Sequence, residues 1–475
     1  MIRVYFDWTV ISDLKQKKES TEPFNSIFNL LSKNKSNLLI PYSVAHLRDL
    51  RRGYKDTEIS KELTYDDLDF LSQLSENNCL FEDYKTNQTK PIICNPKNYF
   101  NDLLENERDY SVDNLFGSTD KKLNDIWKSF AEILKLMPTG IDTKQFESVP
   151  ENYKSLNNLF TNTKKESSFY NLIKDTMDFI TNPNKHTPTY KAMRNYGIDQ
   201  MKINTDSKQW GNAFDYLDTF LAKSNLNKSF VDIVESSLKN FNQDKEITRY
   251  NRFSSYFISL DTFGYYRDKA LPNLLDDAMH SYYGAHCDVF VTDDDNTYNK
   301  SKAVYDFFKI KTQVIKSEDF LSYFYKLNKI GDFEEDLTER IVEIISHSFV
   351  LLDTIDNEKN KVSVHKIDHP LICHFNRMQI SYYDYGSVLT FYKKRETYSQ
   401  FLFWTEVETV INKIVNHFGV DDNLKLEFDN RDKEDLNNEK WKGRIWKRGN
   451  IVSKLAYDDE GFDVKFIVSI YNGST

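Results

Sequence analysis

Short apolar runs alternate with helical segments over the first fifty residues of the chain. Residues 2–6 (IRVYF) are followed directly by Asp7, and residues 37–40 (NLLI) end at Pro41. Between these runs, the segment 23–33 begins at a proline and repeats apolar residues at helical spacing. Short runs separated by a helix are typical of βαβ units, so this pattern predicts the beginning of a parallel sheet.

The same pattern returns far along the chain. Its segments are, in order, 273–285 (helical spacing), 288–291 (strand), 297–309 (helical spacing) and 311–315 (strand). In the N-terminal part, Ser43 follows the apolar run 37–40 and is placed to cap a further helix. We therefore predict one mixed α/β unit with a parallel sheet flanked by helices, split into residues 1–55 and 267–326.

The segment between these two parts, residues 56–266, has a different pattern. Apolar residues recur at helical spacing, for example over 123–134 and 169–180, and polar stretches such as 183–210 separate the helical faces. We interpret 56–266 as a large helical insertion with flexible connections, and 183–210 as one of those connections.

The remainder, residues 330–475, is predicted to be an α+β C-terminal domain. A long helical face runs over 403–418 and stops at Gly419. Alternating apolar residues predict a strand at 424–428 and a hairpin made of 450–457 and 462–470.

Composition and charge narrow the possible functions. The net charge of −10 excludes a uniformly basic surface, so binding to a nucleic acid would need local basic patches. The four cysteines have no CxxC spacing, which disfavours a disulfide scaffold and a zinc ribbon. No signal peptide and no apolar run of roughly 20 residues is found. We expect a cytoplasmic protein without a membrane partner.

Acidic residues follow the predicted strands. Asp7 follows the first strand, and Asp293, Asp294 and Asp295 follow the strand at 288–291. In a parallel sheet the carboxyl ends of the strands gather functional groups at one edge. Clustered carboxylates repel one another and supply the hard oxygen ligands that Mg²⁺ and Mn²⁺ prefer, so the pattern indicates a divalent-metal site.

These motifs resemble those of the PIN-like nuclease family over about residues 1–55 and 267–326. The segment VYFDWTVISDL resembles the family's opening strand with its first acid, and IPYSVAHLRDL resembles its second motif. The segments DDAMHSYYGAHCDVFVTDDD and KAVYDFFKIKTQVI resemble its later motifs. The long central insertion departs from the compact family pattern, and Thr9 stands where many members carry Asn.

The resemblance implies a metal-dependent endonuclease that cleaves RNA, single-stranded or looped, with Mg²⁺ or Mn²⁺. The residues that the resemblance places at the site are Asp7, Asp49, Asp277 and Asp294 as catalytic metal ligands, with Thr9 and Thr292 as supporting hydroxyls. Asp276 competes with Asp277, and Asp293 with Asp294, because the register is not fixed by sequence. Bacterial stand-alone members of the family often act as regulated toxins, so a toxin or phage-defence role is a further expectation.

Several neighbouring residues are candidates for supporting roles. His280 follows Asp277 by about one helical turn and could face the pocket. The helix that carries Asp49 also carries basic residues that suit a phosphate backbone, namely Arg48, Arg51 and Arg52. The alternative is a solvated helix end on which Asp49 pairs with an arginine. An Asp at a strand end is also often only a helix cap.

The residues outside the PIN-like part leave other functions open. The stretch 440–448 (KWKGRIWKR) fits either an amphipathic strand or a surface that stacks single-stranded nucleic acid, and we favour the strand. The histidines at 365, 369 and 374 match no zinc pattern. The alternative functions are a catalytically silent binding or assembly subunit, a flap-type DNA nuclease, and a phosphatase-like enzyme. The insertion or the C-terminal domain could bind a protein partner or a second copy of the chain.

Overall fold

The computed structural model describes most of the chain. The described residues are 1–83, 86, 88–105, 150–163, 169–206, 210–223, 228–241, 247–328, 337–347, 349–357, 360–372, 374–394, 397–399, 401–437, 440–458 and 463–472. The contacts divide the chain into unit 1 (1–97, 283–293 and 308–475) and unit 2 (98–282 and 294–307). None of the described helices is long and apolar enough to cross a membrane.

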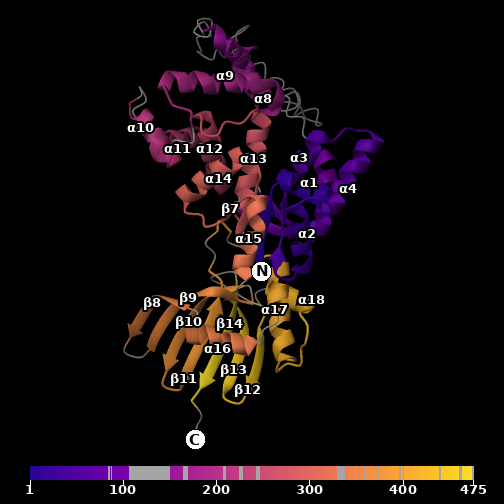
Figure 1. The fold of residues 1–475 in the computed structure, drawn as a ribbon, viewed down its shortest axis with the longest axis vertical. Coiled ribbons are helices and arrows are strands. Elements are labelled where there is room, and N and C mark those ends of the chain that lie inside the picture. Colours follow the sequence, from indigo (N-terminus) through magenta and orange to yellow (C-terminus); the bar gives the residue numbers. More distant parts are fainter. Residues whose placement is uncertain are drawn as a thin grey trace, which may run out of the picture. The chain divides into compact units, whose positions relative to one another are not determined.

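A four-stranded parallel sheet forms the first part of unit 1, in the order β2-β1-β6-β7. Its strands are β1 (Ile2–Phe6), β2 (Leu38–Leu39), β6 (Val289–Val291) and β7 (Gln313–Ile315). Helices α1 (Trp8–Lys17), α2 (Phe24–Lys33) and α15 (Ser317–Asn328) flank it, as Figure 1 shows. Val4, Tyr5 and Phe6 are all buried, as expected for a strand covered on both faces. The predicted parallel sheet flanked by helices is confirmed.

The strand order places a topological switch between β1 and β6. From β1 the chain moves outward to β2, and it later returns to pair β6 on the other side of β1. Asp7 and Asp293 follow these two neighbouring strands, and the Asp7 amide donates to the Val291 carbonyl at 3.0 Å. In open α/β sheets, ligand-binding groups collect at the carboxyl ends of the strands on either side of such a switch.

A second, small sheet of unit 1 was not predicted. It contains β3 (Tyr42–Ser43), β4 (Asn78–Asp83) and β5 (Gln88–Ile93), in that order. Helices α3 (Val44–Gly53) and α4 (Glu58–Ser75) lie between β3 and β4 in the sequence. The predicted cap of α3 is confirmed, because the Ser43 side chain accepts a hydrogen bond from the Ala45 amide. The β4–β5 hairpin lies in a segment expected to be helical.

The C-terminal part of unit 1 is built on a seven-stranded antiparallel sheet, in the order β12-β13-β14-β11-β10-β9-β8. The strands are β8 (Phe349–Asn357), β9 (Asn360–Leu371), β10 (Phe375–Tyr383), β11 (Gly386–Tyr392), β12 (Arg444–Arg448), β13 (Ile451–Asp458) and β14 (Asp463–Tyr471). Helices α16 (Leu337–His347) and α17 (Trp404–Phe418) pack their apolar residues on one face of this sheet. A short helix, α18 (Asn430–Asn437), precedes β12. The predicted hairpin is the β13–β14 pair.

The strand predicted at 424–428 is not formed. The carboxylate of Asp421 accepts hydrogen bonds from the amides of Asn423 and Lys425, both at 2.9 Å, and this turn competes with an extended backbone. Leu424 is 86% exposed, so the alternation of apolar residues does not reflect a buried face.

All the regular elements in the described residues of unit 2 are helices. They are α5 (Pro96–Glu105), η2 (Glu151–Phe160), α8 (Phe169–Thr181), α9 (Pro183–Met201), α10 (Ala213–Leu221), α11 (Phe230–Phe241), α12 (Arg249–Thr262), α13 (Leu271–Gly284) and α14 (Asp295–Phe308), some of which extend by a few residues into unit 1. The helix predicted over 123–134 lies outside the described residues. The domain boundaries predicted from sequence stay a prediction.

Helix α9 occupies a segment that was predicted to be a connection. Pro183 stands at its first position, where a proline's missing amide costs nothing. Thr189, Tyr190 and Arg194 are buried although two of them are polar. Part of the polar composition of this segment therefore belongs to a buried hydrogen-bonding face of a helix.

A buried ion pair joins the first strand of unit 1 to helix α17. Arg3 is 2% exposed and Glu406 is fully buried. The Arg3 guanidinium donates to both carboxylate oxygens of Glu406, to Ser399 Oγ at 2.6 Å and to the Phe401 carbonyl at 2.7 Å. Removing one member of such a pair leaves the other charge buried without its partner.

We therefore expect Arg3→Met to lower the free energy of unfolding by about 3–5 kcal/mol, measured by urea denaturation. The matched control is Lys35→Met, which removes an exposed pair with Glu76 at 3.9 Å and should cost less than about 1 kcal/mol. Equal effects of the two substitutions would contradict a stabilising role for the buried pair. The double variant Arg3→Met/Glu406→Leu should recover part of the loss.

Candidate metal centre

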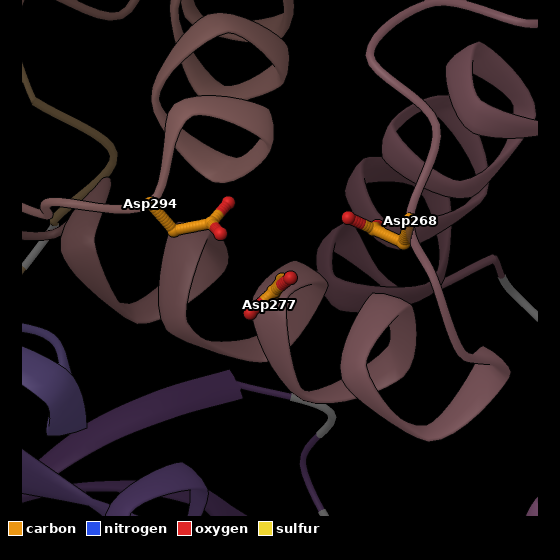
Figure 2. A group of neighbouring side chains, drawn as sticks. All are labelled: Asp268, Asp277 and Asp294. Atoms are coloured by element: carbon orange, nitrogen blue, oxygen red, sulfur yellow. The ribbon is translucent and has the colours of Figure 1, made fainter.

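Three aspartates converge in unit 2, namely Asp268, Asp277 and Asp294. Each offers a carboxylate oxygen, and these three oxygens all lie within 4.8 Å of one another. Figure 2 shows the carboxyl groups gathered in one space, with Asp277 between the other two. Asp268 is buried, Asp277 is half-buried and Asp294 is exposed, so the cluster opens to solvent on the Asp294 side.

Helices α13 and α14 position two of these carboxylates. Asp277 lies in the second turn of α13, and Asp294 immediately precedes α14, where its Oδ1 accepts a hydrogen bond from the Thr297 amide at 2.7 Å. The two helices are tied together at Ser281, whose hydroxyl lies 2.8 Å from that of Ser301 and whose carbonyl accepts from the Tyr305 hydroxyl at 2.5 Å. Asp294 therefore stands at a helix N-terminus, which favours negative charge.

The third carboxylate, Asp268, is held by side chains of α14. Its Oδ1 accepts a hydrogen bond from Asn296 Nδ2 at 3.0 Å, and its Oδ2 accepts from Lys300 Nζ. Its backbone amide donates to Asp261 Oδ2. Both oxygens of Asp268 thus have protein partners, and its orientation is fixed from both sides.

A buried network stands behind Asp268. Asp261 is fully buried in α12, and its Oδ1 accepts hydrogen bonds at 2.7 Å from the Tyr190 hydroxyl and from the Arg194 guanidinium. Lys300 Nζ lies 3.6 Å from Asp261 Oδ2 and 4.9 Å from the centre of the Phe257 ring. Two buried cations therefore support the closed end of the cluster.

The electrostatics of the cluster are unfavourable without a further cation. Burial, then the charge of Asp268 and that of Asp294, raise the pKa of Asp277 well above its usual range, although Lys300 opposes the shift. Burial and Asp261 likewise raise the pKa of Asp268 against the attraction of Lys300. A divalent cation among these oxygens would relieve the repulsion.

An orphaned hydroxyl also lies at the cluster. Thr297 Oγ1 is buried and has no hydrogen-bond partner with good geometry among the described residues. It lies near enough to Asp277 to lower the pKa of that carboxyl. Buried polar groups in proteins are normally satisfied, and an ion or its bound water is one explanation of an exception. All the donors here are hard oxygens, which fit Mg²⁺, Mn²⁺ or Ca²⁺ better than Zn²⁺ or Cu²⁺.

The structure brings together two of the residues predicted from sequence, Asp277 and Asp294. Of their competitors, Asp276 is buried and is not part of the cluster. Asp293 lies in unit 1. Its Oδ1 accepts a hydrogen bond at 2.9 Å from the amide of Ser317, the first residue of α15, so the Asp293 side chain caps that helix. His280 is buried in α13.

The other predicted site residues belong to unit 1. Asp7 is buried, and its Oδ1 accepts from the Val10 amide at 2.9 Å, so it caps α1. Asp49 forms the ion pair with Arg52 that the alternative interpretation expected, but its side chain is half-buried and not fully solvated. The remaining predicted residues in this unit are Thr9 (exposed), Arg48 (exposed), Arg51 (half-buried) and Thr292 (buried). A role for these unit 1 residues at the metal site stays a prediction.

The aromatic and basic stretch 440–448 is partly structural. Trp446 and Arg444 are buried in β12, and Arg444 pairs with Asp432 at 2.6 Å and Asp421 at 3.4 Å. The interpretation as a strand is confirmed over Arg444–Arg448. Within the described residues, no metal-binding group includes His365 or His374.

No sequence pattern predicted Asp268, Thr297 or Lys300. Asp268 lies in the short loop between α12 and α13 and follows no strand, so no motif marks it. Lys300 is on a helix whose polar residues would ordinarily face water. A buried lysine of this kind is recognised only from the fold.

Comparisons with protein-family models, with curated proteins and with solved structures found no significant match to this chain. The fold and the site define the chain as a mixed α/β protein with an aspartate cluster that could hold a divalent metal ion.

The raised pKa of Asp277 has a consequence for stability. A carboxyl whose pKa is raised in the folded state stabilises the fold at low pH and loses that contribution as the pH rises through the folded-state pKa. In a chelator, we therefore expect Asp277→Asn to unfold at a higher temperature than the wild type at about pH 8, with the gap shrinking toward about pH 4.

Differential scanning fluorimetry across this pH range would measure the effect. Asp295→Asn is the matched control, because Asp295 is exposed at the start of α14 and outside the cluster. It should leave the unfolding temperature nearly unchanged. A gap for Asp277→Asn that widens toward low pH would contradict the raised pKa.

Proposed function

We propose that the protein is a divalent-metal-dependent phosphodiester hydrolase, an endonuclease that cleaves RNA. The observation that supports this most is the cluster of Asp268, Asp277 and Asp294, with oxygens within 4.8 Å and an opening at Asp294. A site of this kind supplies a few hard ligands and leaves positions for water and phosphate. The PIN-like sequence motifs around Asp277 and Asp294 point to the same chemistry.

The chain's own residues have distinct parts in this proposal. Bound Mg²⁺ or Mn²⁺ would lower the pKa of a water molecule and neutralise charge on the phosphate. Asp277 and Asp294 bind the ion, and Asp268 holds the closed side of the site in place. Asp294 lies at the solvent side, where the N-terminus of α14 favours the approach of an anionic phosphate. Asp7 and Asp49, with Arg48, Arg51 and Arg52, are proposed to contribute from sequence motifs alone.

The choice of RNA over DNA as the substrate rests on the resemblance to PIN-like nucleases. RNA, single-stranded or looped, is favoured over DNA because endoribonuclease activity is usual for PIN-like proteins. A role as a regulated toxin or phage-defence effector belongs to the same proposal, with the helical insertion or the C-terminal domain as the element that binds a partner.

The test is cleavage of labelled single-stranded RNA and DNA by the purified chain, with Mg²⁺, Mn²⁺ or a chelator. We expect metal-dependent RNA cleavage that falls by about 100-fold or more in Asp277→Asn, because a ligand that neutralises transition-state charge is lost. Asp295→Asn is the matched control and should keep nearly full activity. Asp7→Asn tests the motif of unit 1 in the same assay.

The other outcomes separate the alternatives. Cleavage of DNA alone would keep the metal site and move the function to a flap-type DNA nuclease. Absence of both cleavage and Mn²⁺ binding would contradict the catalytic proposal and favour a binding or assembly subunit. Equal cleavage with and without the chelator would contradict the proposed dependence on a divalent metal ion.

A further inference from the structure

Lys300 is a buried lysine next to the candidate metal ligands. Its side chain is fully buried, and its ammonium donates to Asp268 Oδ2 and lies 3.6 Å from Asp261 Oδ2. A lysine in the interior is costly unless carboxylates compensate it, so its position indicates that the cluster requires positive charge even without a bound ion.

The charges of the cluster are matched by one divalent ion. Asp268, Asp277 and Asp294 carry three negative charges when ionised, and Lys300 offsets one of them. Behind them, the charge of Asp261 is compensated by Arg194, its partner at 2.7 Å. The remaining two negative charges equal the charge of a single Mg²⁺ or Mn²⁺.

The geometry agrees with this count. Oxygens bound to one Mg²⁺, Mn²⁺ or Ca²⁺ ion at about 2.0–2.6 Å lie up to about 4–5 Å apart across the ion, and the three oxygens here lie within 4.8 Å. Two-ion sites keep their ions about 3.5–4 Å apart and need carboxylates that reach both. The Lys300 ammonium already stands on Asp268 Oδ2, where a second divalent ion would be repelled by its charge.

We infer that Lys300 takes the place of a second metal ion, so that the cluster of unit 2 binds one divalent cation and not a pair. The hydroxyl of Thr297, which is buried and has no hydrogen-bond partner of good geometry among the described residues, is an observation separate from the acids that also points to a ligand. The inference rests on the proposed function only through the metal site, and it assigns Lys300 a positioning and charge-balancing role.

The first test counts ions in the whole chain without nucleic acid. Mn²⁺ binding is measured by calorimetry and by electron paramagnetic resonance for the wild type, Asp294→Asn and the control Asp295→Asn. We expect Asp294→Asn to lose one tightly bound ion and Asp295→Asn to lose none, with no spin coupling between ions in the wild type. Loss of two ions, or a coupled Mn²⁺ pair in the wild type, would overturn the inference.

The second test removes the charge of Lys300. Lys300→Met should bind Mn²⁺ about tenfold more tightly or take up a second ion, because an uncompensated carboxylate is added to the site. Its unfolding temperature should fall in a chelator and recover more with Mn²⁺ than that of the wild type. A purely structural role would lower the unfolding temperature equally in both conditions and leave Mn²⁺ affinity unchanged or weaker, which would contradict the inference.

A double variant keeps the second test decisive if Lys300→Met folds poorly. Lys300→Met/Asp268→Asn removes the cation together with its partner charge, so the cluster again carries two negative charges. We expect it to bind one Mn²⁺ with an affinity closer to the wild type than to Lys300→Met. If the single variant does not fold, a double variant that folds but binds two ions or none would overturn the inference.

These experiments separate the inference from the proposed function. Two ions at the cluster, together with RNA cleavage, would leave the nuclease proposal intact and end the single-ion inference. One Mn²⁺ ion at the cluster, without cleavage of any nucleic acid, would support the single-ion inference and contradict the nuclease proposal. A wild type that binds no Mn²⁺ would end both.

Discussion

The mutual repulsion of Asp268, Asp277 and Asp294 is the constraint around which unit 2 is arranged. Three carboxylates within 4.8 Å, two of them partly or wholly withdrawn from water, cannot all be ionised without compensation. Burial and this repulsion raise the pKa of Asp277 and that of Asp268. Lys300, the amide group of Asn296 and the N-terminus of α14 each offset part of it. All three belong to one helix.

Helix α14 therefore connects the fold of unit 2 to its chemistry. Asn296 and Lys300 are four residues apart and lie on the same face of the helix, where both reach Asp268. Farther along, Val304 and Tyr305 are buried, and Ser301 and Tyr305 bond to Ser281 of α13. Because α13 carries Asp277, the packing that fixes the two helices also fixes the distance between Asp277 and Asp294. A change in this packing would alter the site without touching any ligand.

The periodic elements around the site could be predicted from the sequence, but its closed end could not. Helical spacing and a short apolar run located α13, β6 and α14, and the acids beside them identified Asp277 and Asp294 as candidates. Asp268 depends on a loop conformation that no periodicity encodes. Lys300 and Arg194 are charged residues on helices, and only the tertiary packing shows that they are buried. The same reason explains α9, where polar residues that resemble a loop form a buried hydrogen-bonding face.

The three aspartates differ in how far the protein has already used their oxygens. Asp268 has protein partners on both oxygens, and Asp294 is held by a backbone amide at one oxygen while its side chain is exposed. In metal sites with a purely structural role, the protein usually fills every ligand position, whereas catalytic sites keep positions open to water and substrate. The cluster of unit 2 is held by protein partners at its buried end and exposed at the other. Asp294 is therefore the side of the cluster that solvent reaches, while Lys300 and Asn296 hold Asp268 at the opposite side.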